Sequence, residues 1–165
     1  MADRDPIRMQ IKGLMLDPSS KLPIVILRDD ASRYLLPIWI GVFEANAIAL
    51  RVEEIETPRP MTHDLLKAAL SEVGVEVEKI IISDLQDNTF YAEIYLLQDG
   101  KQLTLDSRPS DAIALALRAN APIFVLPEVL KSAKSLDLSE SIEDDDRMKK
   151  WLEEVDPDDL GKYKM

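Results

Sequence analysis

The sequence contains no cysteine. Without a thiol the chain has no disulfide, no cysteine nucleophile and no zinc or iron–sulfur centre held by cysteine. It also contains no run close to the roughly 20 apolar residues that span a bilayer. It begins with charged residues where a secretory signal needs an apolar segment. We therefore expect a cytoplasmic protein that does not contact a membrane.

The strong short motifs of enzyme families are missing as well. There is no GxxxxGK[ST], GxGxxG, HExxH or GxSxG pattern. The familiar modes of nucleotide binding are therefore not indicated. The chain also has a single histidine, His63.

Basic residues are too few for a protein that coats nucleic acid, because such binding depends on lysine and arginine displacing counterions. The net charge is -11, but it is unevenly distributed. Residues 136–165 hold 11 acidic and 5 basic residues, which leaves 20 acidic and 15 basic residues in 1–135. A phosphodiester substrate stays possible if a local basic cluster or metal ions bind it.

The first part of the chain alternates in the manner of β-strands and then changes to helical spacing. Strands are predicted over 7–16, with a bulge near Gly13, over 22–27 and over 34–40; the last is apolar on both faces, which suggests a central strand. Helices are predicted over 42–56 and from Thr62, whose hydroxyl can cap the helix, to Gly74.

The next part predicts an antiparallel sheet followed by a third helix. Two β-rich runs are separated by residues 84–88, and Asp99-Gly100 fits a two-residue hairpin turn. The predicted elements are strands 75–83, 89–97, 102–105 and 123–126, a helix over 112–120 and a last turn over 128–131.

These elements predict an α+β fold with a mainly antiparallel or mixed sheet and three main helices. We expect a domain over 1–135 and an acidic C-terminal extension over 136–165. In the extension, Met148, Trp151 and Val155 lie at helical spacing, which predicts a short amphipathic helix on the domain or on a partner chain. The alternative is a disordered acidic tail.

Three polar clusters occur where strands lead into helices, and helix starts offer free amides that suit anions. The first contains Glu44, which can ligate a metal or act as a general base. The alternative is that Glu44 only favours the positive end of its helix.

The second cluster contains Arg59, Thr62 and His63. His63 is the natural proton shuttle, because histidine titrates near neutral pH. The alternative is a partly exposed histidine in a first helical turn. Arg59 can bind a phosphate through two hydrogen bonds, or pair with a neighbouring acid.

The third cluster, residues 106–111, is the densest. Asp106 and Asp111 flank Arg108, Ser107 and Ser110 at a helix start, so the cluster could hold a divalent cation and a phosphate together. A structural interpretation, with a serine as the helix cap and Asp111 favouring the helix dipole, leaves Arg108 unexplained.

Three segments together resemble the bifunctional nuclease domain family, in order and in spacing. They are LPIWIG at 36–41 with EANAIA at 44–49, RPMTHDLL at 59–66, and DSRPSDAIALA at 106–116. The resemblance covers about 9–125, and the ending of the chain from Trp151 is similar to that of bacterial members.

The resemblance implies an α+β fold of unusual topology, association as a homodimer, and cleavage of RNA and DNA. Our hypothesis is metal-assisted hydrolysis in which Glu44, Asp106 and Asp111 bind Mg²⁺ or Mn²⁺. His63 would transfer the proton, and Arg59 or Arg108 would neutralise the phosphate.

Three polar side chains complete the predicted substrate site: Thr62, Ser107 and Ser110. Two alternatives remain at this stage. One is a non-catalytic binding or regulatory module, and the other is a domain that binds a small anion.

Overall fold

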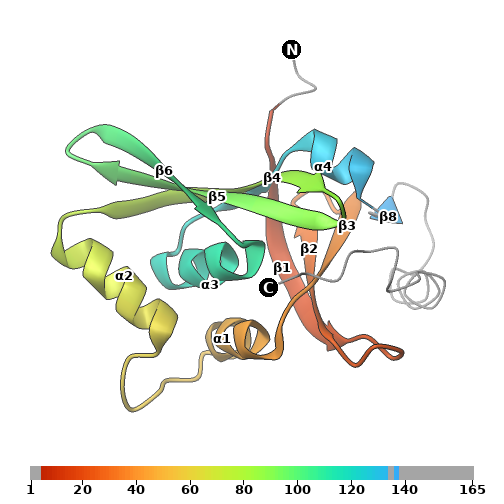
Figure 1. Cartoon of the computed structure of the whole chain (residues 1–165), viewed down its shortest axis with the longest axis horizontal. Helices are drawn as coiled ribbons and strands as arrows, with labels where there is room; N and C mark the ends of the chain where they lie inside the picture. Colours follow the sequence, from red (N-terminus) through yellow and green to blue (C-terminus); the bar gives the residue numbers. More distant parts are fainter. Residues whose placement is uncertain (1–4, 134–135, 138–165) are drawn as a thin grey trace.

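The computed structural model describes residues 5–133 and 136–137. Within these ranges the chain forms an α+β fold with one eight-stranded mixed sheet and four helices (Figure 1). The predicted fold class is therefore confirmed. The proposed helix in the acidic extension lies outside the described residues.

The helices and strands have the bounds β1 (Ile7–Leu16), β2 (Pro23–Asp29), β3 (Tyr34–Trp39), α1 (Val42–Val52), α2 (Thr62–Glu72), β4 (Glu76–Gln86), β5 (Thr89–Gln98), β6 (Lys101–Ser107), α3 (Pro109–Ala119), β7 (Ile123–Val125), α4 (Pro127–Ser132) and β8 (Leu136–Asp137).

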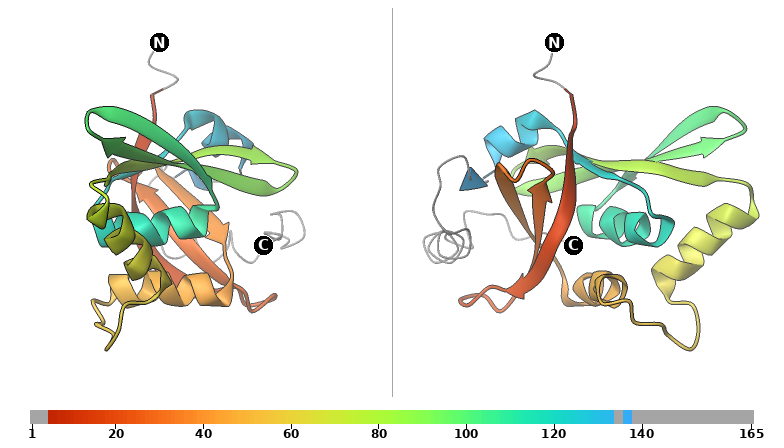
Figure 2. Two further views of the ribbon diagram at one scale, coloured as in Figure 1. Left: turned by 60° about the vertical axis from the view of Figure 1, so that its left-hand side comes forward. Right: turned by 180° about the vertical axis from the view of Figure 1, so that it is seen from behind.

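The strands follow the order β6-β5-β4-β7-β1-β2-β3-β8 across the sheet. All neighbours are antiparallel except β4 and β7, which are parallel. The short strand β7 thus joins the β4–β6 half to the β1–β3 half. The views in Figure 2 show how strongly these two halves are twisted relative to each other.

The hairpin predictions hold, with one turn tighter than expected. Asp99 and Gly100 both have positive φ, at 49° and 79°, as their two-residue turn requires. Asp87 and Asn88 form a similar turn with φ of 48° and 61°. Strand β4 therefore continues to Gln86 instead of ending near Ser83.

The first half of the sheet confirms the predicted bulge and corrects one position. The β1–β2 register shifts between Ile11 and Gly13, where the bulge was expected. Strand β3 is not central, because among the described residues only the two-residue strand β8 lies beyond it. Its burial on both faces suggested a central strand, but burial does not fix a strand's place in a sheet.

Helices α1, α2 and α3 lie together on one face of the sheet, whereas α4 lies on the other side (Figures 1 and 2). Helix α3 is the central one, since Ala112 to Ala116 are all nearly inaccessible to solvent. A helix that is apolar all round is buried on all sides. Helices α1 and α2 both contact α3, and α2 itself has no buried residue.

Helix α1 ends at Val52, earlier than the predicted Glu56. The Ile55 amide donates to the Leu50 carbonyl at 2.8 Å, while Glu54 adopts a left-handed φ of 54°. This pattern closes a helix before the proline-rich segment is reached. Helix α2 ends at Glu72, and Gly74, which was predicted to stop it, follows with a φ of 75°.

The starts of α2 and α3 differ from the predicted caps. Met61, not Thr62, is the N-cap of α2, and its amide donates to the Asp64 carboxylate at 2.9 Å. Arg108 is the N-cap of α3, and Pro109 takes the first helical position. Proline suits that position because its missing amide hydrogen would be unpaired there.

The turn after β1 is held by a buried carboxylate. Asp17 is 3% exposed and accepts hydrogen bonds from Trp39 Nε1 at 2.9 Å and from Ser19 and Ser20. Burial alone would raise the pKa of Asp17, but these hydrogen bonds outweigh it and lower the pKa to about 2. The ionised form is thus favoured in the folded protein.

Substitution of Asp17 by asparagine is expected to lower the free energy of unfolding at pH 7 by about 2 kcal/mol. Because the folded pKa lies below the unfolded one, this stabilisation is present above about pH 4 and is lost as pH falls toward 2. Urea denaturation between pH 7 and pH 2 measures it. A difference between the variant and the wild type that stays constant over this range would contradict the account.

No helix in the described part of the chain is long and apolar enough to cross a membrane.

Candidate active site

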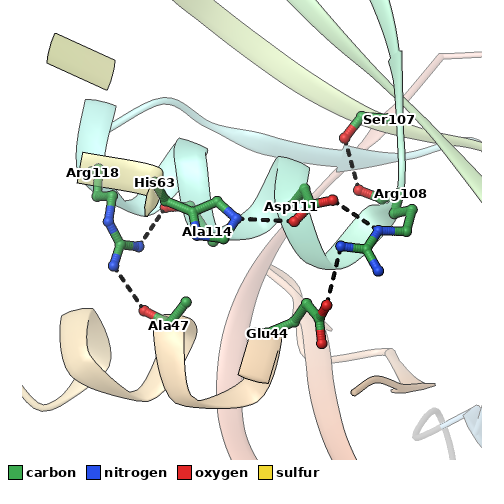
Figure 3. A network of polar contacts seen from close by, with 8 residues as sticks. All are labelled: Glu44, Ala47, His63, Ser107, Arg108, Asp111, Ala114 and Arg118. Atoms are coloured by element: carbon green, nitrogen blue, oxygen red, sulfur yellow. Dashed lines mark hydrogen bonds and ion pairs between the residues drawn. The ribbon is translucent and has the colours of Figure 1, made fainter. Parts of the chain in front are cut away.

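The starts of the three helices meet at one place, although they lie far apart in the sequence. Glu44 is in the first turn of α1, His63 in the first turn of α2, and Asp111 in the first turn of α3. Arg108 immediately precedes α3. Figure 3 shows the side chains pointing toward one another. We call Glu44, His63, Arg108 and Asp111 the helix-start cluster.

A continuous chain of contacts links the cluster. Arg108 Nη2 lies 3.1 Å from Glu44 Oε1, and Arg108 Nε donates to Asp111 Oδ2 at 2.8 Å. Asp111 Oδ1 lies 2.9 Å from His63 Nε2. Asp111 therefore joins a guanidinium on one side to an imidazole on the other (Figure 3).

These contacts favour the ionised form of Asp111. The hydrogen bond from His63 and the interactions with Arg108 lower the pKa of Asp111, although burial opposes them. The pKa of Arg108 is raised, mainly by its hydrogen bond to Asp111. An ionised carboxylate can only accept, so His63 Nε2 donates to Asp111. In a neutral ring the lone pair is then on Nδ1.

Glu44 is the most shielded carboxylate of the cluster, with 12% of its side chain exposed. One of its oxygens contacts Arg108. The other, Oε2, is buried and has no hydrogen-bond partner among the described residues. A buried acceptor without a partner costs free energy, so this oxygen is available to a proton donor that enters the site.

Arg118, which the sequence analysis did not single out, forms a second junction of the same helices. Its side chain is 4% exposed and donates to Asp64 Oδ1 at 2.6 Å. It also donates to the carbonyl oxygens of Ala114 at 2.9 Å and of Ala47 at 3.0 Å. The sequence does contain a feature that could have indicated Arg118. It is an arginine at a position where the apolar pattern of α3 predicts a buried side chain.

Asp64 connects this junction to the start of α2. The amide of Met61 is the main cause of its lowered pKa, and Arg118 adds to the effect. Since Asp64 directly follows His63, the two junctions use adjacent residues of one helical turn. The contacts of His63 with Asp111 and of Asp64 with Arg118 thus both attach the first turn of α2 to α3.

The other predicted residues lie around the cluster. Ser110 is buried, and Ser107 is half-buried and donates its hydroxyl hydrogen to the Arg108 carbonyl at 2.9 Å. Thr62 and Asp106 are both exposed, and Asp106 makes no hydrogen bond or ion pair with the cluster within the described ranges. Arg59 lines a neighbouring pocket.

The predicted metal ligands do not form a metal site. No group of three or more histidine, aspartate or glutamate side chains able to hold a metal occurs in 5–133 or 136–137. Arg108 lies between the carboxylates of Glu44 and Asp111, where a cation would have to bind. The donor set, as arranged, does not fit a divalent ion held by Glu44, Asp106 and Asp111.

A pocket of about 340 Å³ lies next to the second junction. Its lining combines residues from the end of α1, the segment between α1 and α2, and the inner faces of α2 and α3. Arg51, Arg59 and Arg118 line it together with Asp64 and Glu56.

The sequence places the chain in a known family. Residues 25–137 match the model of the bifunctional nuclease domain. The match covers more than half of the chain, so the protein belongs to the bifunctional nuclease domain family. The predicted membership is therefore confirmed.

Similar proteins occur in bacteria and in plants. An uncharacterized protein of Mycobacterium tuberculosis is 36% identical over 161 residues, which cover 92% of this chain and 96% of the relative. Bifunctional nuclease 2 of Oryza sativa is 30% identical over 118 residues, 69% of this chain and 36% of its own length. Bifunctional nuclease 2 of Arabidopsis thaliana is 29% identical over 105 residues, 62% and 32% respectively. This chain thus corresponds to about a third of each plant protein.

Proposed function

We propose that the protein is a nuclease that hydrolyses phosphodiester bonds of RNA and DNA at the helix-start cluster. The observation that carries the proposal is the contact chain from Glu44 through Arg108 and Asp111 to His63. It assembles a base, its orienting carboxylate and a cation from three distant segments. The names of the plant relatives, bifunctional nucleases, support the same activity.

His63 is the group that moves the proton. With Nε2 bonded to Asp111, its Nδ1 is free to take a proton from an attacking water or hydroxyl. Asp111 holds the ring orientation and stabilises the imidazolium that forms, in the way a carboxylate supports a catalytic histidine. The side chain of His63 is 13% exposed, so it is largely shielded from solvent.

Arg108 supplies positive charge for the phosphate. Its side chain is 40% exposed although it contacts two carboxylates. A guanidinium has five N–H donors, so Arg108 can bind a phosphate oxygen while it keeps those contacts. Ser107, Ser110 and Thr62 are the nearest hydroxyls in sequence.

Dependence on Mg²⁺ or Mn²⁺ stays a prediction. The described carboxylates do not provide a ready site, so no step of this mechanism passes through a metal ion. Association as a homodimer and a cytoplasmic location also stay predictions.

Cleavage of labelled single-stranded RNA and DNA tests the proposal, in parallel reactions with Mg²⁺, Mn²⁺ or EDTA. Replacement of Arg108 by glutamine is expected to reduce the cleavage rate about 100-fold, because a donor to developing charge is lost. The matched control is Arg8→Gln, which removes an exposed arginine of β1 with a weak 4.0 Å ion pair. Equal loss in both variants, or none in Arg108→Gln, would refute the assignment of Arg108.

A second candidate function is a non-catalytic binding module. The observation in its favour is that Arg108 and Asp111 are already paired within the cluster, as in a network that only fastens α1, α2 and α3 together. Thermal-shift measurements separate the two functions. Stabilisation by oligonucleotides supports the nuclease. If the melting temperature does not change with metals, nucleotides or oligonucleotides, the binding module is favoured.

A further inference from the structure

The pocket beside Arg118 is separate from the helix-start cluster and has its own chemistry. Arg51 comes from the last turn of α1, Arg59 from the segment before α2, and Arg118 from the last turn of α3. Three arginines thus converge from different elements in a chain whose net charge is -11. This concentration of positive charge indicates an anionic ligand.

The charges of the pocket are not equally available. Arg118 and Asp64 are bonded to each other, and both Asp64 oxygens are used, one by Arg118 and one by the Met61 amide. Arg51 and Arg59 are exposed, and the lining contains only one carboxylate besides that of Asp64, which belongs to Glu56. Two exposed guanidiniums of the lining are therefore available to phosphate oxygens, which arginine can bind through paired hydrogen bonds.

The rest of the lining is largely apolar. Leu50, Ile55, Pro58, Pro60 and Ala68 contribute to it, and Ile55 is 47% exposed. A large apolar side chain this exposed in a concave surface offers contact to a flat, weakly polar group. A volume of about 340 Å³ lies within the range of small-molecule sites. Arginines that can bind a phosphate, together with an apolar surface that can contact a base, match a nucleotide.

The pocket is aligned with the helix-start cluster. On α1, Arg51 follows Glu44 by seven residues, and on α3, Arg118 follows Asp111 by seven residues. Seven residues make about two helical turns, or about 10 Å, so each pair lies on one side of its helix. Figure 3 shows Arg118 and the Arg108–Asp111 pair separated along α3 in this way.

We propose that this pocket binds one nucleoside monophosphate unit, with its phosphate on Arg51 and Arg59 and its base against Leu50, Ile55 and Pro58. If the helix-start cluster cleaves nucleic acid, the unit belongs to the same strand, close to the bond that is cut. A separation of about 10 Å corresponds to about three stacked nucleotides, or fewer in an extended strand. Only this link to the strand rests on the proposed function.

Binding measurements test the pocket without requiring cleavage. The ligands are adenosine 5′-monophosphate, adenosine and inorganic phosphate, followed by calorimetry, and a fluorescent single-stranded oligonucleotide, followed by anisotropy in EDTA. The nucleotide is expected to bind more tightly than adenosine or phosphate. Arg59→Gln and Arg51→Gln are each expected to weaken nucleotide and oligonucleotide binding about tenfold, since each removes a phosphate contact.

The salt dependence gives a second readout. Loss of one phosphate contact is expected to reduce the slope of log K against log salt by about one for the oligonucleotide. Arg8→Gln is the control that removes the same charge from β1 and is expected to leave the slope unchanged. Arg8, Arg51 and Arg59 are all exposed, so their replacement leaves the core intact, which circular dichroism verifies.

The outcomes separate the two sources of the ligand. If adenosine 5′-monophosphate and the oligonucleotide both bind, and only the Arg51 and Arg59 variants weaken this binding, the pocket also takes free nucleotides. Oligonucleotide binding alone, weakened in the same variants, supports a subsite for the strand. Equal affinity for phosphate and nucleotide overturns the base contact, and variants that bind like wild type overturn the pocket. Absence of cleavage alone leaves these binding results unaffected and counts only against the proposed nuclease.

Discussion

Replacing His63 by alanine is expected to lower kcat for phosphodiester cleavage by about 10²- to 10⁴-fold, the range that general acid–base catalysis contributes. The ring is bonded to an ionised Asp111, and His63 is the only histidine of the chain, so no other imidazole can take over the proton. KM is expected to change less than kcat, because His63 acts on the proton and not on the phosphate charge. Initial-rate kinetics on a labelled oligonucleotide measure both constants.

Asp111→Asn is the companion variant. The asparagine amide can present either an oxygen or an NH₂ group to His63. The side chain at position 111 then no longer determines which ring nitrogen carries the proton. We expect a lower kcat and an altered pH–rate profile, since Asp111 would no longer stabilise the protonated ring. A pH–rate profile identical to that of the wild type would show that Asp111 does not act through His63.

Replacing Arg118 by methionine is expected to lower the free energy of unfolding by about 3 kcal/mol. Methionine keeps much of the side chain's length but leaves the Ala47 carbonyl and the Asp64 carboxylate without their partner. Removal of one member of a buried ion pair costs more than its net contribution, because the other member stays desolvated. Asp64 is 32% exposed, so water recovers part of this loss.

Urea denaturation measures the effect, with Arg8→Met as the exposed control, for which we expect a change within about 0.5 kcal/mol. The double variant Arg118→Met with Asp64→Asn is expected to lose less than the sum of the two single losses, because both act on one contact. If Arg118→Met is no less stable than Arg8→Met, the junction of the three helices does not depend on Arg118.

Local structure was largely readable from the sequence because it depends on local rules. Asp99-Gly100 predicted its hairpin through the positive φ that these residues tolerate, and Gly74 predicted the end of α2 for the same reason. The position of β3 was not readable in this way. Its apolar pattern reports burial, and burial arises near an edge as well as in the centre when other elements cover both faces.

The candidate site was partly predictable. The polar segments at Glu44, His63 and Arg108–Asp111 stood out because each interrupts a regular pattern at a helix start, but their contacts depend on how three helices pack. Asp106 shows that closeness in the sequence does not by itself place a residue in the site. It precedes Asp111 by five residues, yet it belongs to the exposed strand β6 and stays outside the cluster. Arg118 was not singled out, because its partners, two backbone carbonyls and a side chain 54 residues away, are set by how the helices pack.

The central claim, that the helix-start cluster cleaves nucleic acid, is tested most directly by one comparison. Wild type, His63→Ala and Arg8→Gln are purified identically, and the cleavage of labelled single-stranded RNA and DNA is followed over time with their folding verified. We predict cleavage by wild type and Arg8→Gln and almost none by His63→Ala. Equal cleavage by all three, or cleavage by none, would contradict the account.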